Sequence, residues 1–190
     1  MFKKFTVALG TTLLAAGVVQ AADLSGAGAT FPAPVYSKWA AAYEDYTGNQ
    51  LNYQAIGSGG GIKQIKAKTV DFGASDKPLK PEELDAAGLY QFPTVIGGVV
   101  PVTNVPGLHS GRLKLTGALL AEIFLGNIKN WNDPKIAAMN PGLGMPNLPI
   151  TVVHRSDGSG TSFLFTTYLS SQSPAWKSQV GGNDSVQWPT

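Results

Sequence analysis

The segment VVHRSDGSGTSFLF (residues 152–165) places an arginine, an aspartate and a run of glycine and hydroxyl residues between an apolar stretch and a predicted helix. The planar guanidinium of Arg155 offers five N–H donors and can bind a tetrahedral oxyanion through two of them at once. Asp157, two residues later, can hold that group in position. An isolated pair of this kind also fits a surface salt bridge, so the segment alone leaves both interpretations open.

Three more loops carry small polar residues where a predicted strand ends or a predicted helix begins. Thr30 lies in GAGATFPAP, Ser58 in IGSGGGI and Asp76 in FGASDKP. Helix amino ends offer N–H groups without partners and a partial positive charge, and open α/β sheets bind ligands at the carboxyl ends of their strands. Each loop alone fits an ordinary capped turn. Together with residues 159–162 they predict a site for an anion.

Asp76 carries the prediction about which anion binds. A carboxylate repels a fully ionised anion, but it accepts a hydrogen bond from an anion that still holds a proton. Hydrogen phosphate has such a proton near neutral pH and sulfate has none, so this residue favours phosphate. The alternative is that Asp76 caps a helix in the segment KPLKPEEL that follows.

Short strands alternating with helices must position these loops. Residues at helical spacing predict a helix that ends near Gly48 and packs in the core through an aromatic face: Val35, Trp39, Ala42, Tyr43 and Tyr46. The segments LNYQAI (residues 51–56) and VDFGA (residues 70–74) predict strands, with a helix capped by Ser58 between them. This is a β-α-β pattern with a parallel sheet.

The second half of the chain continues the alternation. The apolar segment PTVIGGVVPVTN (residues 93–104) predicts a long strand, bent or crossing between two lobes at its glycines and proline. Helices are expected at residues 117–125, after Asp133, and from SGTSFLF onward. PITVVH (residues 149–154) is expected to be a further strand.

The amino-terminal residues are typical of a secretory signal peptide. Lys3 and Lys4 precede an apolar stretch and then small residues, which predicts cleavage of residues 1–22. The stretch is shorter than the roughly 20 apolar residues that span a bilayer. Without the two lysines, the 14 basic residues fall to 12 and balance the 12 acidic ones. Net charge therefore gives no support for a nucleic-acid partner.

Composition argues against several kinds of site. The chain has no cysteine, which excludes disulfides and thiolate chemistry, and its two histidines form no metal-binding pattern. A secreted phosphate-ester hydrolase using His154, Asp157 and Ser159 is the alternative. Residues so close in one turn seldom align as a triad, and no Gly-x-Ser-x-Gly segment is present. A binder of another oxyanion and an added adhesion role both stay open.

Five motifs, taken in order, resemble the periplasmic phosphate-binding proteins of bacterial ABC phosphate importers: LSGAGATFPAPVYSKW, YQAIGSGGGIKQI, TVDFGASDKPL, YQFPTVIGGVV and RSDGSGTSF. The likeness runs from about Asp23 to Thr190. It implies a type II periplasmic-binding fold, an α/β architecture of two lobes with mixed, mainly parallel sheets. Residues 23–98 would form the amino-terminal part of lobe 1 and residues 99–190 the first part of lobe 2. Family members are much longer, so the chain is expected to be an amino-terminal fragment that is incomplete in both lobes.

The resemblance also implies the binding residues and the biological role. Asp157 supports the arginine, and Phe31 binds through its backbone N–H. Neither Lys77 nor His154 is given a role. The implied protein is a periplasmic monomer that uses no cofactor or metal, catalyses nothing and delivers phosphate to the membrane permease subunits of an ABC importer. The implied phosphate ligands are Thr30, Phe31, Ser58, Asp76, Arg155, Ser159, Gly160 and Thr161.

Overall fold

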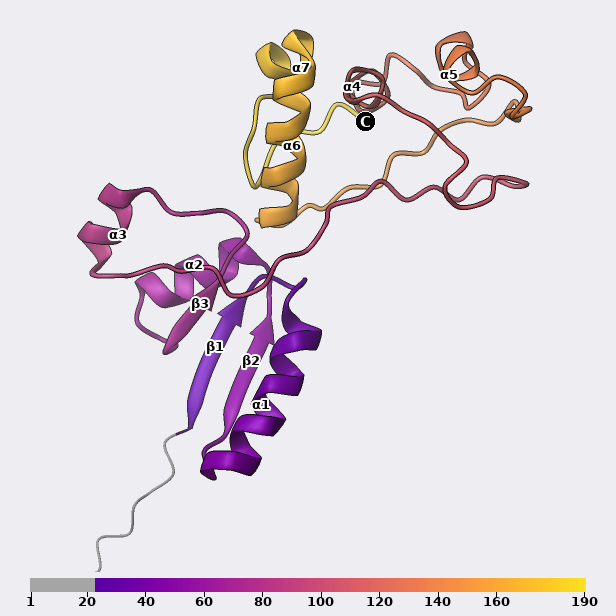
Figure 1. Ribbon diagram of the computed structural model, residues 1–190. Helices are drawn as coiled ribbons and strands as arrows, with labels where there is room; N and C mark the ends of the chain where they lie inside the picture. Colours follow the sequence, from indigo (N-terminus) through magenta and orange to yellow (C-terminus); the bar gives the residue numbers. More distant parts are fainter. Residues whose placement is uncertain (1–22) are drawn as a thin grey trace, which may run out of the picture.

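The computed structural model describes residues 23–190, so the predicted signal peptide lies outside the described residues. Two bodies follow one another along the chain (Figure 1). Residues 24–87 form a sheet with three helices, called here the sheet body, and residues 117–190 form the helical body. Extended chain connects them. None of the described helices is both long and apolar enough to cross a membrane.

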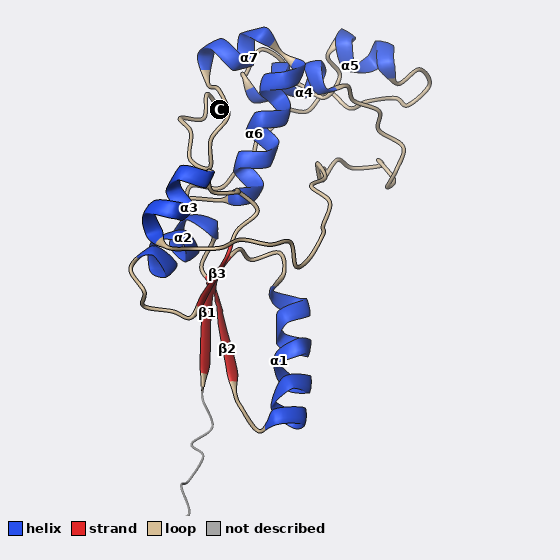
Figure 2. Ribbon diagram, turned by 60° about the vertical axis from the view of Figure 1, so that its left-hand side comes forward, coloured by secondary structure: helices blue, strands red, loops and turns tan. Residues whose placement is uncertain are grey.

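The sheet has three parallel strands in the order β2-β1-β3: β1 (Leu24–Gly28), β2 (Leu51–Ala55) and β3 (Phe72–Ala74). The predicted β-α-β pattern with a parallel sheet is confirmed, with β1 added at its centre. Helix α1 (Ala33–Thr47) contacts β2, and α2 (Ser58–Lys66) contacts β1 and β3. The two helices lie on opposite faces of the sheet (Figure 2). All three strands therefore end at one edge, beside the starts of α1 and α2.

Helix α1 ends where the sequence predicts, but its buried face is rotated. Gly48 adopts a left-handed conformation (φ 72°) and its N–H binds the carbonyl of Glu44, which stops the helix. The buried aromatic is Tyr36, whose ring meets Tyr53 edge-on at 4.9 Å. Trp39, Ala42 and Tyr46 are exposed, so the predicted core-packing face is wrong for these three residues.

The start of α2 also differs from the prediction. Gly57, with φ 85°, occupies the capping position, and no side chain caps the helix. Ser58 is the first helical residue, and its hydroxyl bonds to Asp76 instead. Helix α3 (Pro81–Ala87) begins after Lys80, whose N–H donates to the Glu83 carboxylate. Asp76 therefore does not cap the helix that follows it.

The helical body contains the predicted helices. Thr116 caps α4 (Gly117–Phe124), and Asp133 caps α5 (Pro134–Met139). Helix α6 (Gly160–Gln172) begins after Ser159 and is followed by α7 (Pro174–Gln179). Two buried clusters hold these helices together, one made of Leu119, Ile123, Ile128 and Ile136, the other of Leu120, Ala121, Leu169 and Trp176.

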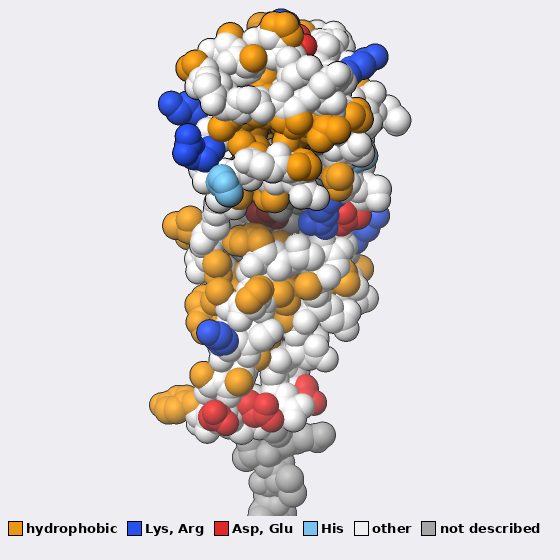
Figure 3. Space-filling view, turned by 90° about the vertical axis from the view of Figure 1, so that its right-hand side faces the viewer, with side chains coloured by type: hydrophobic (Ala, Val, Ile, Leu, Met, Phe, Trp, Pro, Cys, Tyr) orange, Lys and Arg blue, Asp and Glu red, His pale blue; other side chains and the backbone are white. Residues whose placement is uncertain are grey.

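The strands predicted at residues 93–104 and 149–154 are wrong. Both segments are extended, but among residues 23–190 neither has a ladder partner, and the one bridge there joins Asn130 to Pro149. A strand is defined by hydrogen bonds to a neighbouring chain, so an apolar sequence alone does not make one. Ile96 is 96% exposed as a result. Figure 3 shows hydrophobic side chains gathered on one face of the molecule over both bodies.

Candidate anion-binding site

The two bodies meet where the strands end and α6 begins (Figure 1). The N–H of Gly59, in the first turn of α2, donates to the carbonyl of Gly158 at 2.8 Å. A Cβ atom on Gly59 would lie 3.0 Å from that carbonyl oxygen and from the Gly158 Cα. The absence of side chains at both positions therefore lets the two backbones touch.

One carboxylate joins hydroxyl groups from both bodies. Asp76, two residues after β3, accepts from the Ser58 hydroxyl at Oδ1 (2.6 Å) and from the Thr161 hydroxyl at Oδ2 (3.1 Å). Ser58 is buried, and the other two residues are partly buried. A Cβ atom on Gly160 would lie only 1.8 Å from Oδ1 of Asp76. The close fit of this cluster therefore requires a glycine at that position.

The first turn of α6 faces this carboxylate. Ser159 is fully buried, and its hydroxyl accepts from the Ser162 N–H at 3.1 Å as the helix cap. Gly160 and Thr161 are the first two helical residues, whose N–H groups have no acceptor within a helix. The same end carries the partial positive charge of the helix. The arrangement offers donors and a favourable potential to an anion.

Arg155 and Asp157 form a two-bonded ion pair beside this cluster. Nε donates to Oδ1 at 2.7 Å and Nη2 donates to Oδ2. These bonds lower the pKa of Asp157 and raise the pKa of Arg155. A Cβ atom on Gly57 would lie 2.6 Å from the Asp157 carboxylate and 3.2 Å from the guanidinium. The pair therefore rests against the residue that precedes Ser58, with two of its five donors committed to Asp157.

Thr30 and Phe31 lie in the loop between β1 and α1 at the same edge of the sheet, and both are exposed. In the described part of the chain neither bonds to the Asp76 cluster. The loop is fixed at Ala29, whose N–H donates to Ala74 and whose carbonyl accepts from the Tyr53 hydroxyl at 2.6 Å. Burial, and then the nearby Tyr36 and Asp76, raise the pKa of Tyr53, so that this hydroxyl stays a donor.

If phosphate is the ligand, as the sequence predicts, we expect Arg155→Lys to weaken its binding about thirtyfold, or about 2 kcal/mol, although the charge is kept. An ammonium group cannot reproduce the planar donors that meet Asp157 and an anion together. Titration calorimetry of the full-length protein measures the change. Arg112→Lys is the matched control, because Arg112 is exposed and has no contact with the site residues described here. Equal affinities for Arg155→Lys and native protein would make the pair a surface salt bridge.

The residues proposed for a hydrolytic triad do not contact one another. The His154 ring stacks on Trp188 at 4.6 Å, and its nitrogens lie 3.2 Å from the carbonyl oxygens of Arg155 and Thr190. Asp157 is held by Arg155, and Ser159 caps α6. Within residues 23–190, no group of three His, Cys, Asp or Glu side chains is placed to hold a metal ion.

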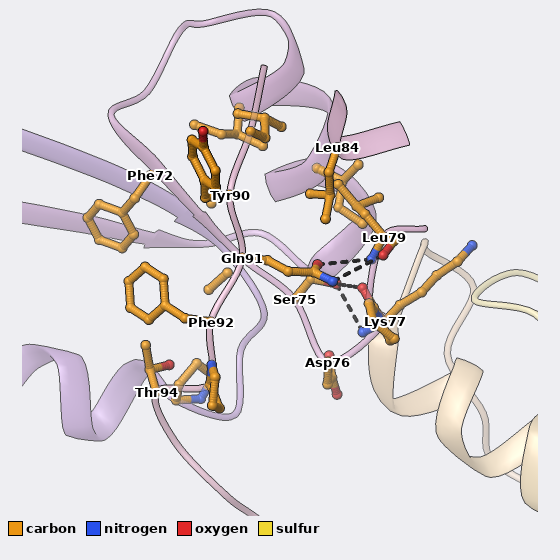
Figure 4. A pocket seen from close by; sticks show the side chains of 18 of the residues that line it. Phe72, Ser75, Asp76, Lys77, Leu79, Leu84, Tyr90, Gln91, Phe92 and Thr94 are labelled. Atoms are coloured by element: carbon orange, nitrogen blue, oxygen red, sulfur yellow. Dashed lines mark hydrogen bonds between the residues drawn. The ribbon is translucent and has the colours of Figure 1, made fainter. Parts of the chain in front are cut away.

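A cavity of about 800 Å³ borders β3 and the chain after α3 (Figure 4). Its lining is mainly apolar and includes Phe72, Leu84 and Phe92, which favours an apolar ligand over an anion. Asp76 and Lys77 belong to its lining, but Figure 4 shows Lys77 extending away from these apolar side chains. The Asp76 cluster is therefore the better candidate for an anion site than the cavity.

Sequence reasoning missed Lys77, Asn183 and Asp184, which also connect the two bodies. The Lys77 ammonium lies 3.0 Å from Asp184 and 3.2 Å from Asn183. No local pattern relates residues more than a hundred positions apart. Gly57 was also missed, although its place between a strand and Ser58 is a signal for a glycine-specific conformation.

Comparison with known proteins adds evidence of descent. A family model described as the PBP superfamily domain matches residues 15–187. The chain is 60% identical over 186 residues to the phosphate-binding protein PstS of Haemophilus influenzae, an alignment that covers 98% of this chain and 54% of the relative. PstS of Xylella fastidiosa strain Temecula1 is 58% identical over 179 residues, covering 94% of this chain and 49% of the relative.

A solved structure agrees with this similarity. It is described as a phosphate ABC transporter substrate-binding protein with bound phosphate, from Clostridium perfringens. It superposes with a TM-score of 0.58 at 28% sequence identity, covering 76% of this chain and 55% of that chain. This chain spans about half the length of the curated relatives it matches.

Proposed function

This chain belongs to the PBP superfamily, and we propose on that basis that it is part of a protein that binds inorganic phosphate. The observation that carries the proposal is the Asp76 carboxylate, which lies between the hydroxyls of Ser58 and Thr161 at the amino end of α6. The relatives named phosphate-binding protein PstS and the phosphate-bound structure from Clostridium perfringens support the choice of ligand.

Phosphate binds between the two bodies, at the first turn of α6. Asp76 accepts a hydrogen bond from the protonated phosphate oxygen, and the hydroxyls that now donate to Asp76 turn to the other oxygens. Arg155 approaches with the donors that Asp157 leaves free. The N–H groups of Gly160 and Thr161 donate to phosphate, and the partial positive charge of the helix amino end attracts it. The full proposed ligand set is Thr30, Phe31, Ser58, Asp76, Arg155, Ser159, Gly160 and Thr161.

The proposed setting combines the sequence pattern with the similarity to phosphate-binding proteins. Residues 1–22 act as a cleaved signal peptide, and the mature protein works in the periplasm. Residues 23–98 belong to one lobe and residues 99–190 to the other, in a monomer that delivers phosphate to the permease subunits of an ABC importer. The ABC transporter named for the Clostridium perfringens structure supports this role. The protein binds its ligand without catalysis.

We expect the full-length mature protein to bind inorganic phosphate with a stoichiometry of one and to hydrolyse no phosphate monoester. The site has helix donors, an arginine and an acceptor, but no nucleophile paired with a base. Titration calorimetry with phosphate and an assay with p-nitrophenyl phosphate test both statements. Turnover that disappears in Ser159→Ala protein would identify a hydrolase and overturn the proposal.

A further inference from the structure

Lys77 crosses from the sheet body to the helical body. Its ammonium lies 3.0 Å from Oδ1 of Asp184 and 3.2 Å from Oδ1 of Asn183. The same group lies 5.6 Å from the centre of the Phe163 ring in α6. The Lys77 and Asp184 side chains are only 29% and 21% exposed. Figure 4 shows the lysine side chain reaching away from the apolar cavity.

Both ends of this contact are attached to the anion-binding site. Lys77 directly follows Asp76 in the chain, so holding its side chain restrains the Asp76 loop. On the other side, the Asp184 carbonyl accepts from the Ser159 N–H at 3.0 Å, at the cap of α6. Lys77 therefore bonds to the segment that fixes the start of α6.

The accepting segment is itself anchored in the helical body. The Asn183 N–H donates to the hydroxyl of Thr166 at 3.0 Å, and that hydroxyl lies 2.9 Å from the Asn183 carbonyl. Thr166 is fully buried. The Asn183 side chain in turn accepts from the Asp184 N–H at 2.9 Å. A rigid acceptor loses little conformational freedom when the lysine binds it, which distinguishes this pair from an ordinary surface salt bridge.

We propose that Lys77 is a positioning residue for phosphate binding. By bonding to Asn183 and Asp184, it holds Asp76 against the first turn of α6 and favours the arrangement in which the two bodies enclose the ligand. The inference rests on the proposed function. A contact that forms only in the ligand-competent arrangement raises the population of that arrangement. The contact therefore tightens the apparent affinity for phosphate, mainly by slowing phosphate release.

A double-mutant cycle in the full-length protein tests the proposal: native, Lys77→Met, Asp184→Ala and the double variant. Asp184→Ala keeps the backbone carbonyl that holds Ser159. We expect each single variant to weaken phosphate affinity about tenfold, mostly through faster dissociation, and the double variant to be little weaker than either. The control Lys66→Met removes a 2.9 Å ion pair to Glu83 that stays within the sheet body, and it should leave affinity unchanged.

The positioning role would be overturned if the affinity losses of the two single variants added up in the double variant. Native phosphate affinity in Lys77→Met protein would also overturn it. If the native protein bound no phosphate, the proposed function would fail. The contact between Lys77 and Asp184 would then be tested in the ligand-free protein. Small-angle X-ray scattering should then give a larger radius of gyration for Lys77→Met than for native and Lys66→Met proteins. Equal radii would show that Lys77 does not hold the two bodies together.

Discussion

Asp76→Asn protein is expected to bind sulfate nearly as well as phosphate. In the native protein, phosphate donates its proton to the carboxylate, whereas sulfate would place an oxygen of like charge against it. The amide in the variant can donate to either anion, so the repulsion is removed and the acceptor preference is weakened. The ratio of the two affinities should fall about a thousandfold, which corresponds to about 4 kcal/mol.

Competition binding of both anions at one pH and low chloride measures this ratio. Asp71→Asn is the matched control, because Asp71 bonds to Ser25 at the amino end of the strands, away from the anion site. It should leave the ratio unchanged. Arsenate, which is protonated much like phosphate, should compete in the native protein. A native protein that takes sulfate as readily as phosphate would show that Asp76 does not select the anion.

Gly160→Ala is expected to reduce phosphate affinity about a thousandfold while leaving the fold intact. The added Cβ would lie 1.8 Å from Oδ1 of Asp76 and 2.5 Å from the Ser58 hydroxyl, so both groups must move away from α6. The donors and the acceptor would then no longer converge, and several charged hydrogen bonds would be lost together. Alanine is a favourable helix residue, so thermal unfolding should change little.

Phosphate titration beside thermal unfolding separates these two effects. Gly98→Ala is the control, because a Cβ atom there would meet no other atom within 4 Å. The φ angle of Gly98 is also not positive, so alanine fits its backbone conformation. It should bind like native protein. Native affinity in the Gly160→Ala variant would mean that Asp76 and α6 do not approach each other when the ligand binds.

Features with a local cause could be predicted from the sequence. Gly48 ends α1 because a glycine tolerates the left-handed turn, and Asp133 with Pro134 starts α5 because both suit a helix amino end. The polar loops were found because each follows a strand or precedes a helix. The rule that parallel strands end at one edge accounts for the meeting of Ser58 and Asp76, but it does not account for Thr161, which comes from the helical body.

Features that depend on distant partners could not be predicted. The apolar segment at residues 93–104 has the composition of a strand, but pairing requires a neighbouring chain that the described residues do not supply. The phase of α1 was misassigned because Tyr36 packs on Tyr53 and Phe72 across the sheet. Ser58 has the sequence position of a helix cap, but its hydroxyl donates a hydrogen bond to Asp76 instead. The contact between Lys77 and Asp184 has no signature in the chain at all.

The backbone bond between Gly59 and Gly158 makes one amide hydrogen a reporter of opening. The Gly59 N–H has its acceptor in the other body, so it is shielded from deuterium exchange only while the two bodies touch. The N–H of Gly61, two residues later, binds Gly57 within the sheet body and is shielded independently of the helical body. The difference in exchange between these two neighbouring glycines therefore isolates the free energy of separating the bodies from the local fraying of α2.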